Sequence, residues 1–310
     1  MATTKYSDRS IPKISLENFD SRIDEITQEL VAAAETDGFF VIVDHGISSE
    51  EIEAQFENAA RFFALPDEVK ATVPFSRRNV RPSTGVPDQK ESYQMQYGAN
   101  MEGMWLPEAT LAGFREQSLQ FMHKVQAVSE RLMVCFARGL GFPDRYFVEY
   151  HDVTKPNIQT VLRLLHYFAL DPTQVVPVDY YRAGAHADWD LLTLLFQRPG
   201  QSGLEICPGR EVFTAFGLGD VWTKVEPGPA GSSEISTFHR VKTPSDPAAD
   251  YFGPRYSMAY FNQPNTDCQI QGPLKKYPLV TGSQFTEAAM KRNYSALEAK
   301  KAAVELEGSK

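Results

Sequence analysis

Residues 184–188, Gly-Ala-His-Ala-Asp, place a histidine and an aspartate two positions apart. In an extended backbone such side chains point to the same side, so His186 and Asp188 can reach one point. A second histidine, His239, follows later in the chain. Two imidazoles and one carboxylate form the facial triad that holds iron(II) and leaves coordination positions open. Alone this pattern is weak, because a His-x-Asp triplet often arises by chance and a single histidine is more often structural.

A second pair of polar residues lies on an expected strand at 255–261. Arg255 and Ser257 share one face of that strand, and a guanidinium inside a β core needs an acidic partner. A small dicarboxylate supplies one, because arginine grips a carboxylate with two parallel hydrogen bonds and serine adds a third. The competing interpretation is an internal salt bridge, or an edge strand with Arg255 in solvent.

The cysteines argue against two other classes of site. A closed zinc site uses four ligands, usually with cysteine, and no cysteine adjoins His186 or His239. Cys135, Cys207 and Cys268 are far apart and odd in number, which argues against a disulfide framework and fits a reducing compartment. A zinc hydrolase is disfavoured further by the lack of a general-base motif near the triad.

Composition and charge limit the kinds of partner that the chain can have. The chain has 310 residues and a net charge of -9, and it lacks a long Lys/Arg run, so no nucleic-acid partner is expected. No apolar window approaches the length of about 20 residues that spans a membrane, and residues 1–10 show no signal peptide. We expect a cytoplasmic protein, monomeric by default, that acts on a small molecule.

The helices and strands that must position these residues are expected in different parts of the chain. The first part is mostly helical, with strands at 11–16 and 39–43, a helix ended by Gly38, and a second helix opened by a Ser48–Glu51 capping box. A looser, Pro- and Gly-rich segment covers 75–105, and a long helix covers 108–140.

Short apolar runs divided by Gly, Pro and Asp occupy about 160–265 and predict many short strands, as in a sandwich or jelly-roll barrel. Helical periodicity returns at 283–305. The expected layout is an N-terminal helical region (1–105), a supporting helix (106–150), a β core (151–280) and a C-terminal helix (281–310), as one structural unit.

The order of His-x-Asp, His and Arg-x-Ser in a strand-rich half resembles the iron(II)/2-oxoglutarate-dependent dioxygenases, in the isopenicillin N synthase-like branch of fungal type. Further matching motifs lie outside the site: Ile11-Pro12, Asp37-Gly38-Phe39-Phe40, Asp44-His45-Gly46-Ile47, Phe63-Ala64-Leu65-Pro66, Asp88-Gln89-Lys90-Glu91-Ser92-Tyr93 and Leu162-Arg163-Leu164-Leu165-His166-Tyr167. Together they cover about residues 11–300.

The resemblance implies a mainly β fold, a double-stranded β-helix (jelly-roll) core with surrounding helices. It implies that His186, Asp188 and His239 bind iron(II), and that Arg255 and Ser257 hold the distal carboxylate of 2-oxoglutarate. Tyr167 stands where the family places a tyrosine that also touches this co-substrate. O2 is then the oxidant and ascorbate a candidate reductant. The outcome is hydroxylation, desaturation or ring formation, with succinate and CO2 as by-products.

One departure from the family lies just before the distal histidine. Only nine residues, Gly228 to Ser236, separate the run that ends at Pro227 from Thr237-Phe238-His239, where relatives usually have about a dozen more. A missing strand there would misplace His239. Two alternatives therefore stay open beside the enzyme: an iron oxidase of the same fold that does not use 2-oxoglutarate, and an inactive relative that binds a small molecule.

The substrate side of the pocket is expected from the 75–105 segment and the C-terminal helix. Tyr93, Met95 and Tyr97 are the candidate contacts, which suggests an apolar or aromatic-compatible substrate, as in secondary metabolism. The other histidines are expected to be structural: His45 in a turn, His123 and His151 on surfaces, and His166 packed or hydrogen-bonded.

Overall fold

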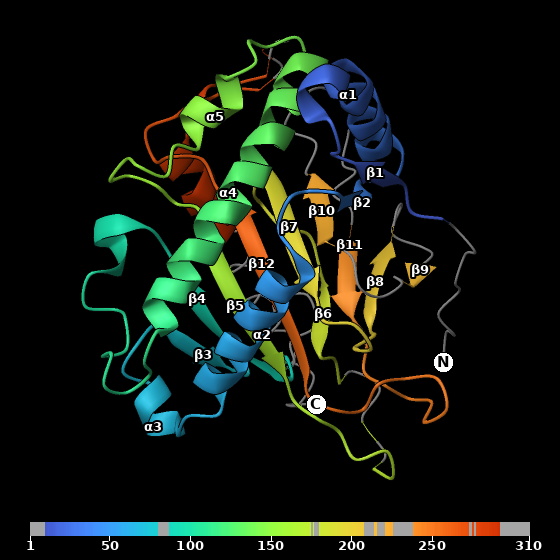
Figure 1. Cartoon of the computed structure of the whole chain (residues 1–310), viewed down its shortest axis with the longest axis vertical. Helices are drawn as coiled ribbons and strands as arrows, with labels where there is room; N and C mark the ends of the chain where they lie inside the picture. The colour runs from blue at the N-terminus through green and yellow to red at the C-terminus, as the bar shows by residue number, and fades with distance from the viewer. Residues whose placement is uncertain are drawn as a thin grey trace, which may run out of the picture.

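The computed structural model of the chain describes residues 10–79, 87–174, 176, 180–207, 214–215, 221–225, 238–272, 275 and 277–291. Within these residues the elements agree broadly with the sequence pattern, and helices and strands are both abundant (Figure 1). No helix in the described part of the chain is long and apolar enough to cross a membrane.

The N-terminal elements are β1 (Lys13–Ser15), α1 (Phe19–Thr36), β2 (Phe39–Val43), α2 (Ser49–Phe63) and the short α3 (Asp67–Lys70). Gly38, at φ 68°, turns the chain from α1 into β2 in a conformation that glycine adopts at little cost. The predicted capping box opens α2: Glu51 N donates to Ser48 Oγ at 3.2 Å, and Ser48 N donates to Glu51 Oε2 at 2.9 Å.

The 75–105 segment, predicted as loose, contains two strands and a short helix: β3 (Phe75–Arg77), β4 (Lys90–Met95) and the 3-10 helix Gly98–Met101. β4 pairs along its whole length with β5 (Val161–Tyr167). Composition hid it, because four of the six residues of β4 are polar and the buried Glu91 takes a position on the same face as Tyr93 and Met95. The region expected to be helical thus adds four strands, β1 to β4, to the main sheet.

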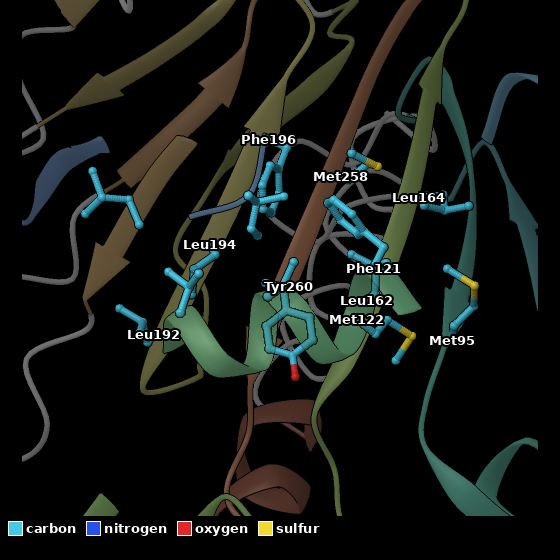
Figure 2. Close-up of a cluster of buried hydrophobic side chains, with 14 of the residues drawn as sticks. Met95, Phe121, Met122, Leu162, Leu164, Leu192, Leu194, Phe196, Met258 and Tyr260 are labelled. Atoms are coloured by element: carbon cyan, nitrogen blue, oxygen red, sulfur yellow. The ribbon is translucent and has the colours of Figure 1, made fainter. Parts of the chain in front are cut away.

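The long helix α4 (Phe114–Gly139) is confirmed, with a later start than predicted, after Gly113 in the left-handed region. It is followed by α5 (Tyr146–Tyr150). In Figure 1 α4 runs across the large sheet, and Figure 2 shows its Phe121 and Met122 among side chains of the strands. The C-terminal helix is described for 282–291, and the rest of its predicted length lies outside the described residues.

Two antiparallel sheets carry the second half of the chain. The large sheet has the order β1-β2-β10-β7-β12-β5-β4-β3, in which only β1 and β2 are parallel, and the small sheet has the order β6-β11-β8-β9. A two-stranded sheet pairs β13 with β14. The strands not yet bounded are β6 (Ala183–His186), β7 (Leu192–Gln197), β8 (Leu204–Cys207), β9 (Thr214–Ala215), β10 (Val221–Val225), β11 (Phe238–Val241), β12 (Arg255–Asn262), β13 (Gln269–Ile270) and β14 (Val280–Thr281).

The two faces of the large sheet have different partners. One face packs on α4 through a large core that includes Leu162, Leu164, Met258 and Tyr260 (Figure 2). The other packs against the small sheet through a second core, whose members come from both sheets: Phe39, Val41, Leu165, Tyr167, Ala183, Leu204, Ile206, Val241 and Ala259. We call this second face the inner face. Because neighbouring residues of a strand alternate between faces, register decides which side chains can reach the small sheet.

Candidate metal centre

The three predicted ligands meet on the small sheet. His186 ends β6, and the antiparallel pairing of β6 with β11 sets His239 directly opposite it. Asp188 lies two residues after His186 in the chain, just beyond the end of β6. Asp188 Oδ1 lies 3.6 Å from His186 Nε2 and 3.8 Å from His239 Nε2, and the two imidazole centroids are 4.1 Å apart.

These donor atoms all lie within 4.8 Å of one another, on side chains that are half-buried. That spacing lets all three reach one ion at the usual ligand distance of about 2.1 Å. Two imidazoles and a carboxylate, without cysteine, are the donor set of a non-haem iron(II) site with open positions. The residues present therefore fit the metal.

Neighbouring groups fix the ligands. His186 Nδ1 lies 2.9 Å from the carbonyl oxygen of Gly184, an arrangement that leaves Nε2 for the metal. The hydroxyl of Thr193, on β7, lies 3.1 Å from Asp188 Oδ2 and 2.7 Å from Asp190 Oδ2. The ring of Phe39 meets that of His239 edge-on, with centroids 6.0 Å apart. Thr193 and Phe39 were not predicted, because nothing in their sequence context separates them from ordinary strand residues.

The metal strand is also tied to the N-terminal region. Asp88, which is buried, accepts a hydrogen bond from Gly184 N at 3.0 Å and pairs with Lys90 Nζ at 3.0 Å. This contact joins the segment before β4 to the strand that ends in His186. A buried carboxylate in this position fixes where β6 begins.

Arg255 and Ser257 lie side by side on the inner face of β12, only 1% and 2% exposed. Arg255 Nε donates to Gln201 O at 3.1 Å, Nη2 donates to Gln197 Oε1, and the guanidinium carbon lies 4.8 Å from the ring centroid of Tyr167. Both acceptors are neutral, and burial lowers the pKa of Arg255.

Within the described residues, Nη1 of Arg255 and Oγ of Ser257 have no hydrogen-bond partner, and Arg255 forms no salt bridge. Buried polar groups in this condition are costly. Neither competing interpretation of Arg255, an internal salt bridge or exposure at an edge, is therefore found in the described part of the chain. The pair fits a carboxylate supplied by a ligand, and Tyr167 lies where it would flank that ligand.

A second buried arginine was not predicted. Arg182, 1% exposed and directly before β6, donates to the carbonyls of Tyr251 at 3.0 Å and Gly253 at 2.7 Å. Burial and the nearby charge of Arg255 lower the pKa of Arg182 to about 10. It holds the chain just before β12, and so helps to place Arg255. Its sequence context offered no signal beyond its position beside the metal strand.

The predicted substrate contacts lie elsewhere. Tyr93 and Met95 are fully buried and Tyr97 is 4% exposed, all in the core between the large sheet and α4. Tyr97 Oη lies 2.7 Å from Tyr260 Oη, also on that side. Alternation along β4 explains the positions of Tyr93 and Met95: Lys90, Ser92 and Gln94 take the inner face, so Tyr93 and Met95 take the other. The structure gives Tyr93, Met95 and Tyr97 no place at the site.

Three of the remaining histidines test the structural expectation. His166 Nδ1 lies 2.7 Å from Glu91 Oε1, as expected of a hydrogen-bonded residue. His123 is exposed. His151 was expected on the surface and is 3% exposed, with Nδ1 2.7 Å from the carbonyl oxygen of Phe147. Its burial lowers its pKa to about 4.

The short segment Gly228 to Ser236 lies outside the described residues. The strand that follows it, β11, nevertheless pairs with both β6 and β8 and sets His239 opposite His186. The misplacement of His239 expected from a shortened segment is therefore not observed.

Comparisons with known proteins agree with this geometry. A family profile described as the N-terminal region of "non-haem dioxygenase in morphine synthesis" matches residues 11–105. Among curated relatives, the 2-oxoglutarate-Fe(II) type oxidoreductase ppzD of Metarhizium rileyi is 28% identical, over 88% of this chain and 82% of its own length. The proline hydroxylase buaE of Petromyces alliaceus is 28% identical, over 81% of this chain and 85% of its own length.

A solved structure extends the likeness to three dimensions. The crystal structure of a full-length Neurospora crassa protein in complex with α-ketoglutarate (2-oxoglutarate) superposes with a TM-score of 0.79 at 26% identity, covering 93% of this chain and 100% of that one. A second structure, of the same protein with α-ketoglutarate and thymine, gives a TM-score of 0.77 over 89% of this chain and 94% of that one. With the donor set at His186, Asp188 and His239, these likenesses show that the chain is similar to iron(II)/2-oxoglutarate-dependent dioxygenases.

Proposed function

We propose that the chain is an oxygenase that uses iron(II), O2 and 2-oxoglutarate to oxidise a small organic molecule, with release of succinate and CO2. The observation that carries the proposal is the pairing of two sites across the two sheets. The triad of His186, Asp188 and His239 lies on the small sheet side, and the buried Arg255 and Ser257 face it from the large sheet.

The arrangement of strands supports a jelly-roll, or double-stranded β-helix, core. Along the chain, β5 to β12 alternate between the large and the small sheet, apart from the consecutive β8 and β9. A chain that winds back and forth in this way encloses the inner face between the sheets. The N-terminal strands β1 to β4 extend the large sheet and α4 covers its outer face, so we propose that the described elements act as one structural unit.

Iron(II) bound by the triad supplies the redox chemistry with O2 and 2-oxoglutarate that oxidises a substrate C–H bond. The protein's own part is to bind and orient. Arg255 and Ser257 hold the distal carboxylate, which gives the buried guanidinium the anion that its neutral partners do not. Thr193 holds Asp188, and Gly184 fixes the tautomer of His186. The apolar side chains of the inner face keep water from the reacting groups.

The relatives act on small molecules of different kinds: one is a proline hydroxylase, and the Neurospora crassa protein has been crystallised with thymine and with 5-formyluracil. For this chain the proposal is a small organic substrate, with hydroxylation, desaturation and ring formation as the reaction class. An oxidase that does not use 2-oxoglutarate is the second candidate, and the unfilled hydrogen-bonding capacity of Arg255 and Ser257 disfavours it.

The test is anaerobic visible absorption of the purified protein given iron(II) and then 2-oxoglutarate. The wild type is expected to show a metal-to-ligand charge-transfer band, because the triad leaves positions for a chelating keto acid. Asp188→Ala removes a ligand and should weaken iron binding by more than about 100-fold, since even residues that only support a ligand cost 10–100-fold. Asp20→Ala, at an exposed position in α1, is the matched control.

Two results would contradict the proposal. Iron binding without a band on addition of 2-oxoglutarate would favour the oxidase. A folded wild type that does not bind iron would favour an inactive relative that binds small molecules.

A further inference from the structure

We propose that Gln197 determines which keto acid the site accepts. It positions the guanidinium of Arg255, and because its amide is neutral, it leaves the positive charge of Arg255 to a carboxylate of the ligand. The inference rests on the proposed function and deepens it. Gln197 is a positioning residue that makes the site selective for a co-substrate with a second carboxylate.

Register places Gln197 beside the residues that hold this second carboxylate. Gln197 on β7 is directly opposite Ser257 on β12, and two residues along the same strands Leu195 is opposite Ala259. Ala259 belongs to the core between the two sheets, and Leu195 packs against that core. Because residues two apart on a strand share a face, Gln197 lies on the inner face together with Ser257.

Two acceptors occupy one edge of the Arg255 guanidinium. Nη2 donates to Gln197 Oε1, and Nε donates to Gln201 O at 3.1 Å. Gln201 is itself held on β12, because its Oε1 accepts from Tyr256 N at 2.6 Å. These contacts leave Nη1, which is buried and has no hydrogen-bond partner among the described residues, at the free end of the fork. That end suits a bidentate contact with a carboxylate.

The acceptors around this arginine supply no negative charge. Both partners of Arg255 are neutral, an amide and a backbone carbonyl, and the equally buried Arg182 donates to backbone carbonyl oxygens. Burial and the charge of Arg255 lower the pKa of Arg182 to about 10. Asp250 also acts on Arg182, but its carboxylate pairs with Lys242 Nζ at 2.7 Å. Two buried cations with neutral acceptors form a positive region that an anionic ligand stabilises.

The choice between an amide and a carboxylate at position 197 decides what balances the charge of Arg255. A glutamate has nearly the same size as Gln197 and accepts the same hydrogen bond. Its carboxylate would stay ionised beside two cations and would form an ion pair with Arg255 inside the protein. A ligand carboxylate would then meet an arginine that is already neutralised, next to a like charge. The neutral amide positions the guanidinium without competing with the ligand.

Strand β7 supports both ends of the co-substrate site. Thr193, four residues before Gln197 and on the same face, donates from its hydroxyl to Asp188 Oδ2 at 3.1 Å. One strand therefore holds a metal ligand through Thr193 and the arginine through Gln197. Its length fixes the separation between the two ends that a keto acid has to bridge.

The experiment measures the affinity of the full chain, loaded with iron(II) without O2, for two keto acids. 2-Oxoglutarate and 5-methyl-2-oxohexanoate share the keto acid end that chelates iron, but the second has an isopropyl group in place of the distal carboxylate. The charge-transfer band reports binding of both, without turnover. We expect the wild type to bind 2-oxoglutarate at least about 100-fold more tightly, because charge-assisted hydrogen bonds are made only with the carboxylate.

Gln197→Glu should raise the Kd for 2-oxoglutarate by at least about 100-fold and keep the Kd for 5-methyl-2-oxohexanoate within about threefold of the wild type. The selectivity between the two ligands is then lost. The thermal unfolding midpoint of the metal-free variant should equal or exceed that of the wild type, because the new carboxylate pairs with Arg255. Gln197→Met, which removes the acceptor without adding a charge, should raise the Kd for 2-oxoglutarate about tenfold.

Gln94→Glu is the matched control. Gln94 also lies on the inner face, and its Oε1 accepts from the guanidinium of Arg163 at 2.6 Å, so the substitution adds the same charge in a similar contact. Arg163 is four residues along β5 from Tyr167, the partner of Arg255, which is about 13 Å at 3.3 Å per residue. The Kd of this variant for 2-oxoglutarate should stay within about threefold of the wild type.

The two substitutions of Gln197 separate its role from that of a brace between β7 and β12. A brace would be kept in Gln197→Glu and lost in Gln197→Met, with the selectivity between the keto acids unchanged in both. Gln197→Met also keeps the inference testable if Gln197→Glu does not fold, since unchanged selectivity in Gln197→Met overturns it.

Several other results would overturn the inference and leave the proposed function standing: wild-type selectivity in Gln197→Glu, an equal loss of affinity for both keto acids, or the same loss in Gln94→Glu. Equal affinity of the wild type for both keto acids would do so too. If the wild type binds iron but shows no band with 2-oxoglutarate, the proposed function fails and the inference with it.

Discussion

At the scale of single residues, Arg255 has the most unusual surroundings. It is a fully buried cation whose two hydrogen-bond acceptors are both neutral amide oxygens. Removing one partner of a buried ion pair is strongly destabilising, but Arg255 has no ionic partner among the described residues, and under the proposed function a ligand supplies it. Substitutions of Arg255 should therefore affect ligand binding far more than folding.

Arg255→Met is expected to raise the Kd for 2-oxoglutarate by about 100-fold, and Ser257→Ala by about tenfold, because a charge-assisted bidentate contact is stronger than one hydroxyl bond. The free energy of unfolding of the ligand-free Arg255→Met protein should stay within about 1 kcal/mol of the wild type. Anaerobic titration of the charge-transfer band, together with urea unfolding, measures both. Wild-type affinity in Arg255→Met would place the dicarboxylate elsewhere.

Some residues of the candidate site could be predicted from the sequence and others could not. His186, Asp188 and His239 could be predicted because their order, followed by Arg255 and Ser257, resembles a known family. The His-x-Asp spacing alone was a weak signal. Thr193 and Arg182 could not, because their roles depend on which strand lies beside them. The wrong choice of Tyr93, Met95 and Tyr97 has the same cause: aromatic type suggested a substrate contact, and only strand register shows which face they take.

At the scale of elements, the metal strand β6 depends on a contact from outside its own sheet. Asp88 accepts the hydrogen bond of Gly184 N, two residues before His186. Asp88→Ala leaves that buried N–H without this acceptor, which should lower the free energy of unfolding by about 1–3 kcal/mol. It should also lower Mn(II) affinity about 10–100-fold, as for other groups that orient ligands.

Asp88→Asn is the matched variant, since its amide oxygen can still accept from Gly184 N, and it should keep most of the metal affinity. Isothermal titration with Mn(II) and urea unfolding measure the two effects. Equal metal affinity in Asp88→Ala and the wild type would show that β6 is placed by its pairing with β11 alone.

Elements with a local signal were predicted well. The capping box of α2 and the glycine after α1 need only residues close in sequence, and both are confirmed. β4 was missed because its burial is non-local: Glu91 is buried beside Lys70 Nζ at 3.0 Å and His166 Nδ1 at 2.7 Å. A strand with a buried charge does not show the alternation that marks an amphipathic strand.

At the scale of the whole molecule, acid stability should reflect His151. Its pKa is about 4 in the folded chain, below the ordinary value of 6.5, because burial disfavours the charged imidazolium. The unfolded chain therefore takes up a proton first as pH falls. The free energy of unfolding is therefore unaffected by this titration above about pH 6.5. It falls progressively towards pH 4, by about 3 kcal/mol in total.

His151→Gln keeps a donor for the Phe147 carbonyl and removes the titration. Urea unfolding of the metal-free proteins at several pH values between 7.5 and 4.5 should show the wild type losing stability faster than the variant. Parallel curves for the two proteins would mean that His151 is protonated without cost in the folded state.

The overall arrangement was predicted in outline. Many short strands after a helical region indicated the β core, but not that four N-terminal strands extend its larger sheet. Pairings such as that of β2 with β10 join residues far apart in the chain, and no local pattern reports them.

The unfilled guanidinium of Arg255 has a consequence for how long the protein lasts. A ligand that binds only the folded state adds about 2.7 kcal/mol when its concentration is 100 times its Kd. Domains are commonly stable by only about 5–15 kcal/mol, and protein abundance in cells responds to changes of 1–2 kcal/mol through proteolysis. A cell short of 2-oxoglutarate would therefore hold less of this protein, so that the supply of a central metabolite would set its amount as well as its rate.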